Sequence, residues 1–290
     1  IIPNRKKFGI LSVILIVVSI ASVAVKGFDF SIDFTGGQVY TVEYSDKVKH
    51  EADLTKALAD AGIVGAKVRS LGGSSANAYQ ISMKASEDLQ FETKMAEAFE
   101  KANQKVEFVA KDNVGPTIGK ELRFNAILSV ILAWIAIGLY VWFRFGKLGL
   151  GFGIGAVLGL VHDSIITLGF ISLFGLSFDG ALIASLLTMI GYSVNDTIVV
   201  FDRVRENTAT YGMSKFGETL NNSINQCFSR TMITSVTTLF VCLVLAIMGG
   251  SSIRDFGLVM VFGIFIGTYS SVCICSPFVL WYSKHFKGGV

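Results

Sequence analysis

Apolar and polar positions fall into long blocks along this chain. Six apolar runs contain almost no charge, and each is long enough to cross a bilayer as a helix. The first follows Arg5, Lys6 and Lys7 and continues into Lys26 without the small-residue cleavage site of a signal peptide, so it is predicted to be a retained span. The predicted spans are Phe8–Val25, Asn125–Phe143, Leu148–Leu173, Phe178–Phe201, Met232–Met248 and Phe256–Trp281.

The polar segment between the first and second spans has the pattern of a folded domain. Strand patterns occur at Gln38–Tyr44, Lys67–Leu71, Tyr79–Lys84 and Val106–Lys111, with Gly72–Ser75 as the turn between the second and third. Residues 54–61 and 91–102 have helical spacing of apolar side chains. The order β-α-β-β-α-β predicts a ferredoxin-like fold. The fold class is therefore an integral membrane α-helical protein with six transmembrane helices and one α+β ferredoxin-like domain.

Positive charge is distributed unevenly over the short connections. With the N-terminus inside, the inner segments carry eleven basic residues, and the short outer loops carry only Arg254. The positive-inside rule then predicts that both termini are cytoplasmic and that residues 26–123 are extracytoplasmic. The predicted organisation is 1–25 for the N-terminus and first helix, 26–123 for the outer domain, and 124–290 for a five-helix region with an inner loop at 202–230.

Composition supports a membrane protein and excludes several other classes. The 290 residues are 52% hydrophobic and 16% charged, well below the charged fraction of about a quarter in soluble domains. The net charge of +3 gives no indication of nucleic-acid binding, because the basic residues lie at helix ends. All four cysteines fall in or near the spans without a CxxC pair, so neither a disulfide framework nor a metal site is expected. No cofactor is predicted.

Polar residues inside the spans are the candidate functional residues. Asp196, with Asn195 beside it, lies in the inner half of the fourth span, and Arg230 begins the fifth. A charged residue in hydrocarbon costs roughly 2.5–3.5 kcal/mol on insertion scales, and such residues usually mark ion or substrate pathways. The spacing allows an ion pair between Asp196 and Arg230, direct or through water, which could carry protons or only join two helices. Asp163 is a further candidate, whereas His162 is predicted to be structural.

Other motifs have simpler interpretations. The glycines at GxxxG spacing in the third and sixth spans are predicted to allow close helix packing. In the charged block Asp202, Arg203, Arg205 and Glu206, a solvated helix end explains the arginines but not the acids. The amphipathic segment 207–229 is predicted to be a surface or partner contact. The segment 115–121 is one residue short of a phosphate loop, and 191–195 lacks the last glycine of a nucleophile elbow. An enzyme is therefore not expected.

Several segments in order resemble the SecF family of the resistance-nodulation-division superfamily. The resemblance covers nearly the whole chain and includes the DFTGG element at 33–37, the element at 114–122 that leads into the second span, and segments at 161–163, 191–207 and 229–235. The matching signature residues are Asp33, Gly36, Gly37, Gly115, Pro116, Asp202, Arg203, Arg205 and Glu206.

The resemblance implies both partners and a function. The family pairs with SecD, separate or fused, beside the Sec translocon channel in the cell inner membrane of bacteria or archaea, and uses the proton-motive force to promote late-stage preprotein export. It assigns the intramembrane acid and base to Asp196 and Arg230, while the principal proton-carrying aspartate lies in SecD. Two alternatives remain: a scaffold that holds SecD or the channel without conducting protons, and a small-molecule exporter of the same superfamily.

Overall fold

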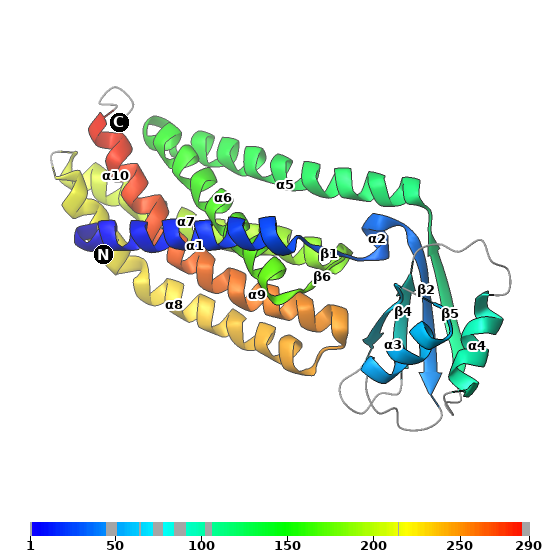
Figure 1. Cartoon of the computed structure of the whole chain (residues 1–290). Helices are drawn as coiled ribbons and strands as arrows, with labels where there is room; N and C mark the ends of the chain where they lie inside the picture. Colours follow the sequence, from blue (N-terminus) through cyan, green and yellow to red (C-terminus); the bar gives the residue numbers. More distant parts are fainter. Residues whose placement is uncertain are drawn as a thin grey trace.

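The computed structural model (Figure 1) describes residues 2–44, 51–63, 65–71, 78–83, 91–101, 106–213 and 215–285. Six helical stretches in this described part are long and apolar enough to cross a membrane, which confirms the predicted number of spans. They contain α1 (Arg5–Lys26), α5 (Pro116–Phe145), α6 (Gly149–Phe174), α7 (Gly180–Tyr211), α8 (Phe216–Met248), and α9 (Ser251–Ser270) with α10 (Ser276–His285).

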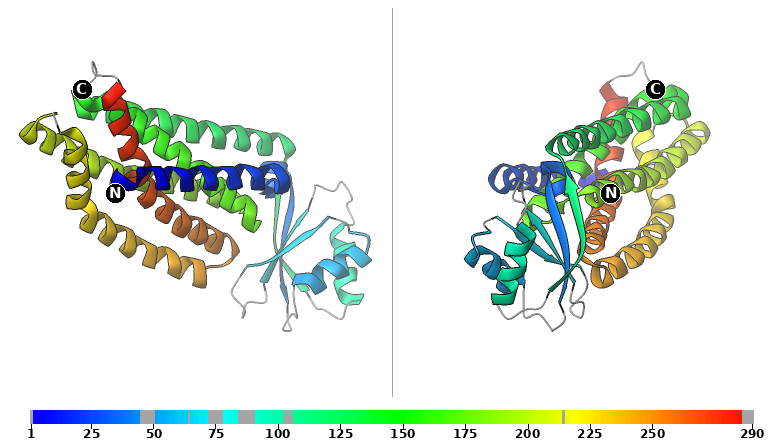
Figure 2. Two further views of the ribbon diagram at one scale, coloured as in Figure 1. Left: turned by 60° about the vertical axis from the view of Figure 1, so that its left-hand side comes forward. Right: turned by 90° about the vertical axis from the view of Figure 1, so that its right-hand side faces the viewer.

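The helices form an elongated bundle with inner and outer members (Figures 1 and 2). Much of α6, α7 and α9 is buried, whereas α1, α5 and α8 expose rows of isoleucine, leucine, valine and phenylalanine. The buried positions of α1 are instead Ser12, Ser19 and Ser22. Apolar side chains outward and small polar ones inward suit a helix that faces lipid tails, because helix contacts in a bilayer favour small residues.

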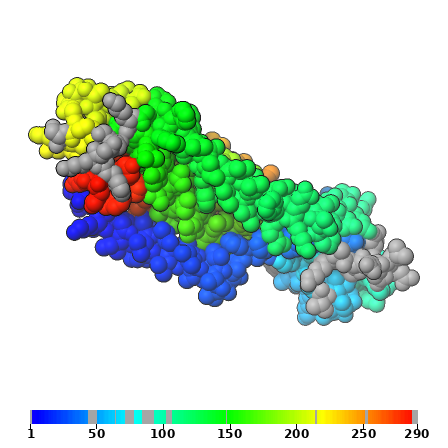
Figure 3. Space-filling model, turned by 90° about the horizontal axis from the view of Figure 1, so that it is seen from above, coloured from blue at the N-terminus to red at the C-terminus, as the bar shows by residue number. Residues whose placement is uncertain are grey.

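A separate sheet domain projects beyond one end of the bundle (Figures 1 and 3). Its antiparallel sheet has the order β3-β4-β2-β5, and two helices pack on it. The predicted β-α-β-β-α-β element order is confirmed; the side of the membrane stays a prediction. The elements are β2 (Gly37–Tyr44), α3 (Glu51–Asp60), β3 (Lys67–Ser70), β4 (Ala78–Met83), α4 (Phe91–Lys101) and β5 (Val106–Val114).

The core of this domain follows from the alternation in β4. Tyr79, Ile81 and Met83 are all buried, and they pack with Leu58 of α3 and Phe99 of α4. The predicted inward face of this strand is therefore confirmed, since residues two apart on a strand lie on the same face. The predicted turn at 72–75 lies outside the described residues.

Three helix boundaries differ from the predictions. The predicted inner loop 202–230 is wrong, because α7 continues to Tyr211 and α8 begins at Phe216, so most of this segment is helical. The predicted outer domain also ends too late, because α5 already begins at Pro116. Proline suits the first turn of a helix, where its missing N–H is not needed. Hydropathy locates the apolar centre of each helix but not the polar turns that continue it.

The sixth span is not a uniform helix. A π-helical segment at Ser271–Cys275 (η3) separates α9 from α10, and the two helices run in different directions in Figure 1. The glycines of the third span lie against this bend: a Cβ at Gly155 would be 3.1 Å from Val279 Cγ2 of α10. Those at the sixth span meet α7, with a Cβ at Gly267 2.8 Å from Ser193 Cβ. These contacts agree with the predicted packing role.

Candidate functional site

A buried carboxylate at Asp163 lies at the centre of the bundle. The side chain is fully buried and accepts hydrogen bonds at Oδ2 from Ser193 Oγ of α7 at 2.6 Å and from Ser270 Oγ of α9 at 2.8 Å. Its Oδ1 is 2.9 Å from Nδ1 of the neighbouring His162. The carboxylate is thus held by partners from three helices, α6, α7 and α9, and is well satisfied for a buried polar group.

The hydrogen-bonded network continues from His162 to the first helix. His162 Nε2 is 3.1 Å from Ser12 Oγ of α1, which is 2.9 Å from the hydroxyl of Tyr269 in α9. Tyr269 in turn donates to the backbone oxygen of Phe8 at 2.7 Å. His162 therefore connects Asp163 to α1, in line with its predicted structural role. Neither Ser12 nor Tyr269 could be singled out from the sequence, because serine and tyrosine are common in membrane helices.

Asp196 occupies a second and less satisfied polar site. Its side chain is 2% exposed, and Thr268 Oγ1 of α9 lies 3.5 Å from Oδ2, at the limit of a hydrogen bond. Thr268 also lies 2.7 Å from Ser235 Oγ of α8. The hydroxyl of Tyr192, four residues before Asp196 on α7, is buried without a partner among the described residues. The site therefore joins α7, α8 and α9 with few strong hydrogen bonds.

The structure separates the two other residues predicted near Asp196. Asn195 lies on the exposed face of α7, away from the buried carboxylate. Arg230 lies on the exposed face of α8, and no ion pair within 4 Å joins it to Asp196, both being described residues. The charge of Arg230 nevertheless acts on Asp196 at longer range, so a direct ion pair is absent from this arrangement and the predicted pair through water stays a prediction. Sequence spacing gives the depth of Arg230 in the membrane but not the face of α8 on which it lies.

The DFTGG element folds into a compact junction between the bundle and the sheet domain. A two-residue strand β1 (Asp29–Phe30) pairs in parallel with β6 (Ser177–Phe178), and a short helix α2 (Ile32–Thr35) follows. Asp33 Oδ2 accepts a hydrogen bond from Gly180 N at the start of α7, at 3.3 Å. A carboxylate is favoured there, because the first backbone N–H groups of a helix lack partners.

The glycines of the junction allow a close approach of two signature segments. Gly36 has φ 73°, and a Cβ there would lie 2.8 Å from Pro116 Cα. A Cβ at Gly119 would lie 2.9 Å from Gly36 N. Arg123 then donates to the backbone oxygen of Phe34 at 2.6 Å. The signature segments 33–37 and 115–119 therefore have a structural role in common, since each contacts the other.

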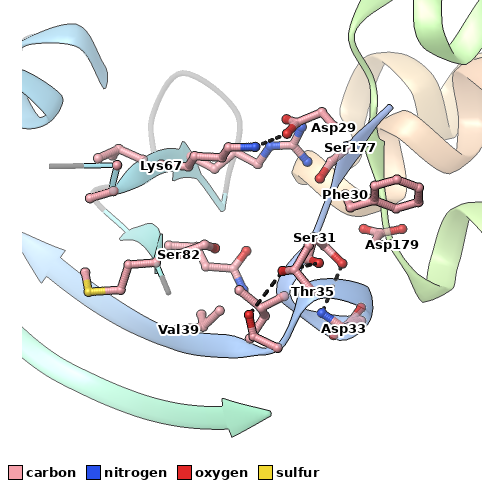
Figure 4. A pocket seen from close by; sticks show the side chains of 18 of the residues that line it. Asp29, Phe30, Ser31, Asp33, Thr35, Val39, Lys67, Ser82, Ser177 and Asp179 are labelled. Carbon is pink, nitrogen blue, oxygen red and sulfur yellow. Dashed lines mark hydrogen bonds and ion pairs between the residues drawn. The ribbon is translucent and has the colours of Figure 1, made fainter. Parts of the chain in front are cut away.

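A polar cleft of about 840 Å³ lies beside this junction (Figure 4). Lys67 of β3 forms an ion pair across it with Asp29 of β1. A second pair joins Arg69 Nη1 of β3 to Asp255 Oδ2 of α9 at 3.3 Å. These contacts connect one edge of the sheet domain to the end of the bundle, in addition to the chain connections at β2 and α5.

The charged block of α7 pairs with its neighbours at the opposite end of the bundle. Asp202 Oδ1 is 3.3 Å from Arg144 Nη2 of α5 and 3.0 Å from Arg205 Nη2. Arg203 contacts Glu206 at 2.8 Å and donates to Gln226 Oε1 of α8 at 2.6 Å. A solvated helix end explained the arginines but not the acids; the structure shows that the acids hold arginines of α5 and α7 in place.

The described residues offer no group of three histidine, cysteine, aspartate or glutamate side chains that could hold a metal ion. The two buried sites consist of carboxylate, hydroxyl and imidazole groups, which donate and accept hydrogen bonds. The structure does not bring the predicted residues into one site. It places Asp163 and Asp196 at two sites that both contact α9, and it adds Ser193, Ser235, Thr268 and Ser270. Asn195 lies on the exposed face of α7, and Arg230 acts on Asp196 only at longer range.

Comparison with known families identifies the chain. A family model described as "Protein export membrane protein SecD/SecF, C-terminal" matches residues 94–285, and one described as "SecD/SecF GG Motif" matches residues 21–48. The chain belongs to the SecD/SecF family. The protein translocase subunit SecF of Sebaldella termitidis is 36% identical over 289 residues, which cover 99% of this chain and 92% of that protein.

A longer relative shows the same fold. The protein translocase subunit SecDF of Thermus thermophilus is 41% identical over 265 residues, which cover 90% of this chain but only 35% of that protein. Its crystal structure, described as that of a translocon-associated membrane protein, matches with a TM-score of 0.85 and 36% identity over 98% of this chain and 38% of that chain. The SecD/SecF fold and the character of a multi-pass membrane protein are thus confirmed.

Proposed function

We propose that this chain is a SecF-like subunit of the Sec protein translocation machinery, which works with SecD and the proton-motive force to promote late-stage preprotein export. The support is family membership and the SecF and SecDF names of its relatives. In this proposal the chain is not an enzyme, and the energy comes from proton movement. The observation that carries the proposal is the weakly satisfied carboxylate of Asp196 inside the bundle.

The two buried carboxylates have different roles in this proposal. Asp163 accepts two short hydroxyl hydrogen bonds and contacts a histidine, so a change in its protonation would break a complete network. Asp196 interacts with the hydroxyl groups of Thr268, at the long distance of 3.5 Å, and of Ser235, so gaining a proton there disrupts less than it would at Asp163. We therefore assign the exchange of protons to Asp196 and the positioning of α6, α7 and α9 to Asp163.

Arg230 acts on Asp196 in a second arrangement of the helices. It lies five residues before Ser235 on α8, roughly 7.5 Å along the helix axis. Ser235 already touches the Asp196 site through Thr268. Five residues place Arg230 about 140° around α8 from Ser235, so a rotation of α8 and the length of the arginine side chain together bring its charge to Asp196. One proton crossing about 100 mV releases about 2.3 kcal/mol. This is comparable to the insertion cost of a carboxylate, so protonation can bias two helix arrangements.

The exposed face of α7 is the proposed contact for SecD. Ala184, Thr188, Gly191 and Asn195 follow one another at helical spacing of three or four, and all are exposed. An amide exposed to hydrocarbon is unfavourable, and small residues allow another helix to approach closely. The lipid therefore suits this face less well than a helix of a partner does.

An export assay tests the proton-dependent role. Arg230→Met and Asp196→Asn should each leave the SecD complex assembled and remove the part of preprotein export into vesicles that depends on the gradient. Arg230→Lys should keep an intermediate level of gradient-dependent export, because lysine keeps the charge but loses the planar fork of arginine. Glu218→Gln is the matched control, since it makes the same carboxylate-to-amide change at an exposed position. If both neutral variants assemble and respond fully to the gradient, the scaffold function replaces the conducting one.

A second experiment tests the SecD contact by itself. A Cβ at Gly191 would have nothing within 4 Å in this chain, so Gly191→Leu should not disturb its own fold. It should nevertheless reduce co-purification with SecD several-fold, whereas Ala136→Leu on the exposed face of α5 should not. Equal SecD recovery from both variants would place the partner elsewhere.

The proposed location rests on the distribution of basic residues along the chain and the positive-inside rule. The chain lies in the cell inner membrane with both termini in the cytoplasm and the sheet domain on the outer side, near the translocon channel and the emerging preprotein. The support is the excess of basic residues at the end of the bundle where α1 begins and α10 ends (Figure 1).

A further inference from the structure

An apolar groove of about 360 Å³ opens between α5, α6 and α7, at the end of the bundle nearest the sheet domain. Its walls are almost entirely aliphatic and aromatic side chains of these helices. The rings of Phe28, Phe30, Phe34 and Phe178 close the end next to the junction. This groove takes no part in the Asp163 or Asp196 sites, so its role is independent of the proposed proton chemistry.

The helix packing explains why the groove exists. Near the far end, α5 and α6 almost touch, because a Cβ at Gly153 would lie 2.9 Å from the backbone oxygen of Gly138. At the junction end, the ring of Phe30 lies between α5 and the body of the bundle, with the guanidinium of Arg123 5.0 Å from its centroid. The two helices therefore diverge toward the sheet domain, and the space between them is left unfilled.

The groove opens to the surroundings of the bundle rather than to its interior. Ile127 and Ile131 of α5 line it and are 59% and 42% exposed. In Figure 3 the surface of α5 is uncovered along much of its length. In a bilayer this opening faces lipid tails, so the groove is accessible to a lipid without a path through the protein.

The depth of the groove corresponds to one leaflet. Arg123 at its mouth is the last charged residue before a stretch of 20 uncharged residues in α5, so it marks the membrane surface. Trp134, eleven residues further along α5, also lines the groove and lies roughly 16 Å deeper at 1.5 Å per residue. Half of a hydrocarbon core of about 30 Å is nearly the same length.

Charge and volume indicate the occupant. Arg123 donates one hydrogen bond to Phe34 O, and no carboxylate among the described residues lies within ion-pairing distance of it. A guanidinium with free donors at the membrane surface matches a phosphate. The groove volume of about 360 Å³ admits a single extended chain but does not enclose a helix of ~10 Å diameter. We infer that the groove binds one acyl chain of a phospholipid whose phosphate pairs with Arg123.

Native mass spectrometry of the full chain co-expressed with SecD tests this inference. The probes are a phosphatidylglycerol and a diacylglycerol with the same acyl chains. The wild type should retain phosphatidylglycerol, and Ala126→Trp, which fills the groove, should reduce retention at least fivefold. The matched control Ala136→Trp makes the same change on the same helix outside the groove.

Substitutions that change the charge of Arg123 test its contact with the lipid phosphate. Arg123→Gln should bring retention of phosphatidylglycerol down to that of diacylglycerol, Arg123→Lys should restore it in part, and Lys120→Gln should leave it unchanged. Equal retention by Ala126→Trp and Ala136→Trp would overturn the inference. If Ala126→Trp instead loses SecD while lipid retention is unchanged, the groove receives a partner helix, which overturns it as well.

A spectroscopic measurement gives an answer even where Ala126→Trp fails to accumulate. With Trp142→Phe and Trp281→Phe, Trp134 is the one tryptophan left. Brominated phosphatidylglycerol should then quench its fluorescence saturably, at a mole fraction several-fold below that needed for brominated diacylglycerol. Quenching that is linear in both probes would mean contact with bulk lipid only and would contradict a binding site.

Discussion

At the scale of single residues, the hydrogen bonds of Asp163 lead to a stability prediction. Ser193→Ala removes a 2.6 Å hydrogen bond to Asp163 Oδ2 and keeps the Cβ that packs against Gly267. Loss of a hydrogen bond to a buried group costs about 1–3 kcal/mol. We expect a clearly lower unfolding midpoint of the purified protein in detergent. Ser129→Ala, an exposed serine bonded to its own helix, should change the midpoint little; an equal loss would contradict the role of Asp163.

The two glycines Gly36 and Gly27 separate backbone strain from steric contact. Both have a positive φ, 73° and 67°, but a Cβ at Gly36 meets Pro116, whereas one at Gly27 has open space. A left-handed conformation costs a non-glycine residue about 1–2 kcal/mol. Gly27→Ala should therefore accumulate with a modestly lower midpoint, and Gly36→Ala should hardly accumulate. Similar accumulation of both would mean that the junction tolerates a side chain, and membrane yield measured by immunoblot distinguishes these outcomes.

The sequence predicted the candidate carboxylates better than their partners. Asp163 and Asp196 stand out because each is charged within an apolar run. The partners of His162, Ser12 and Tyr269, lie 150 and 107 residues away in the chain, and no spacing rule connects them. The exposure of Arg230 could not be predicted either, because the rotation of α8 depends on its packing against α7 and α9, which a single sequence does not contain.

At the scale of elements, the sheet domain is predicted to fold without the membrane. Its core includes Tyr40, Leu58, Ile81 and Phe99, all buried within residues 37–114. When residues 37–114 are expressed alone, they should unfold cooperatively on heating, as measured by circular dichroism. Phe99→Ala should cost about 3–5 kcal/mol and leave little folded protein, whereas the exposed Glu100→Ala should change stability by less than about 0.5 kcal/mol. A non-cooperative melt of the unsubstituted domain would mean that it needs the bundle.

Elements with a long sequence pattern could be predicted, and elements with a short one could not. Spans of about 20 apolar residues and alternation over β4 are strong signals, and both were confirmed. The strands β1 and β6 have two residues each, and their paired residues are 148 positions apart, so no periodicity predicts the pairing. The polar ends of α7 and α8 were predicted to be a loop because a helix outside the bilayer does not need a long run of apolar residues.

At the scale of the whole molecule, helix length and charge together predict orientation. The helices α7 and α8 have 32 and 33 residues, or roughly 48–50 Å, which exceeds a bilayer core of about 30 Å. Their charged ends therefore project from the membrane opposite the sheet domain. A reporter enzyme active only outside the cytoplasm should work after Gly62 and fail after Gly212. Both sites are glycines with open space around them. Activity after Gly212 but not after Gly62 would mean that the protein has the opposite orientation in the membrane.

The ion pairs of β3 lead to a prediction about how the two parts of the molecule are held together. The sheet domain is joined to the bundle by the chain at β2 and β5, while Arg69–Asp255 and Lys67–Asp29 hold its β3 edge. The side chains of Arg69 and Asp255 are 31% and 11% exposed, so their attraction is screened less than that of a surface pair. Without these pairs, the domain is free to pivot about its two chain connections.

Spin labels at Asp60 and Met248 should report this pivot by their distance distribution. Arg69→Glu should broaden the distribution, and combining it with Asp255→Arg should narrow it again, because the swap restores an attraction worth about 1 kcal/mol. The distance distribution of the wild type should broaden when the salt concentration rises from about 0.1 to about 1 M, because the Debye length then falls from about 10 to about 3 Å. Lys215→Glu, in a pair within one helix, is the control. An unchanged distribution for Arg69→Glu would mean that apolar contacts at the junction, rather than charge, fix the domain on the bundle.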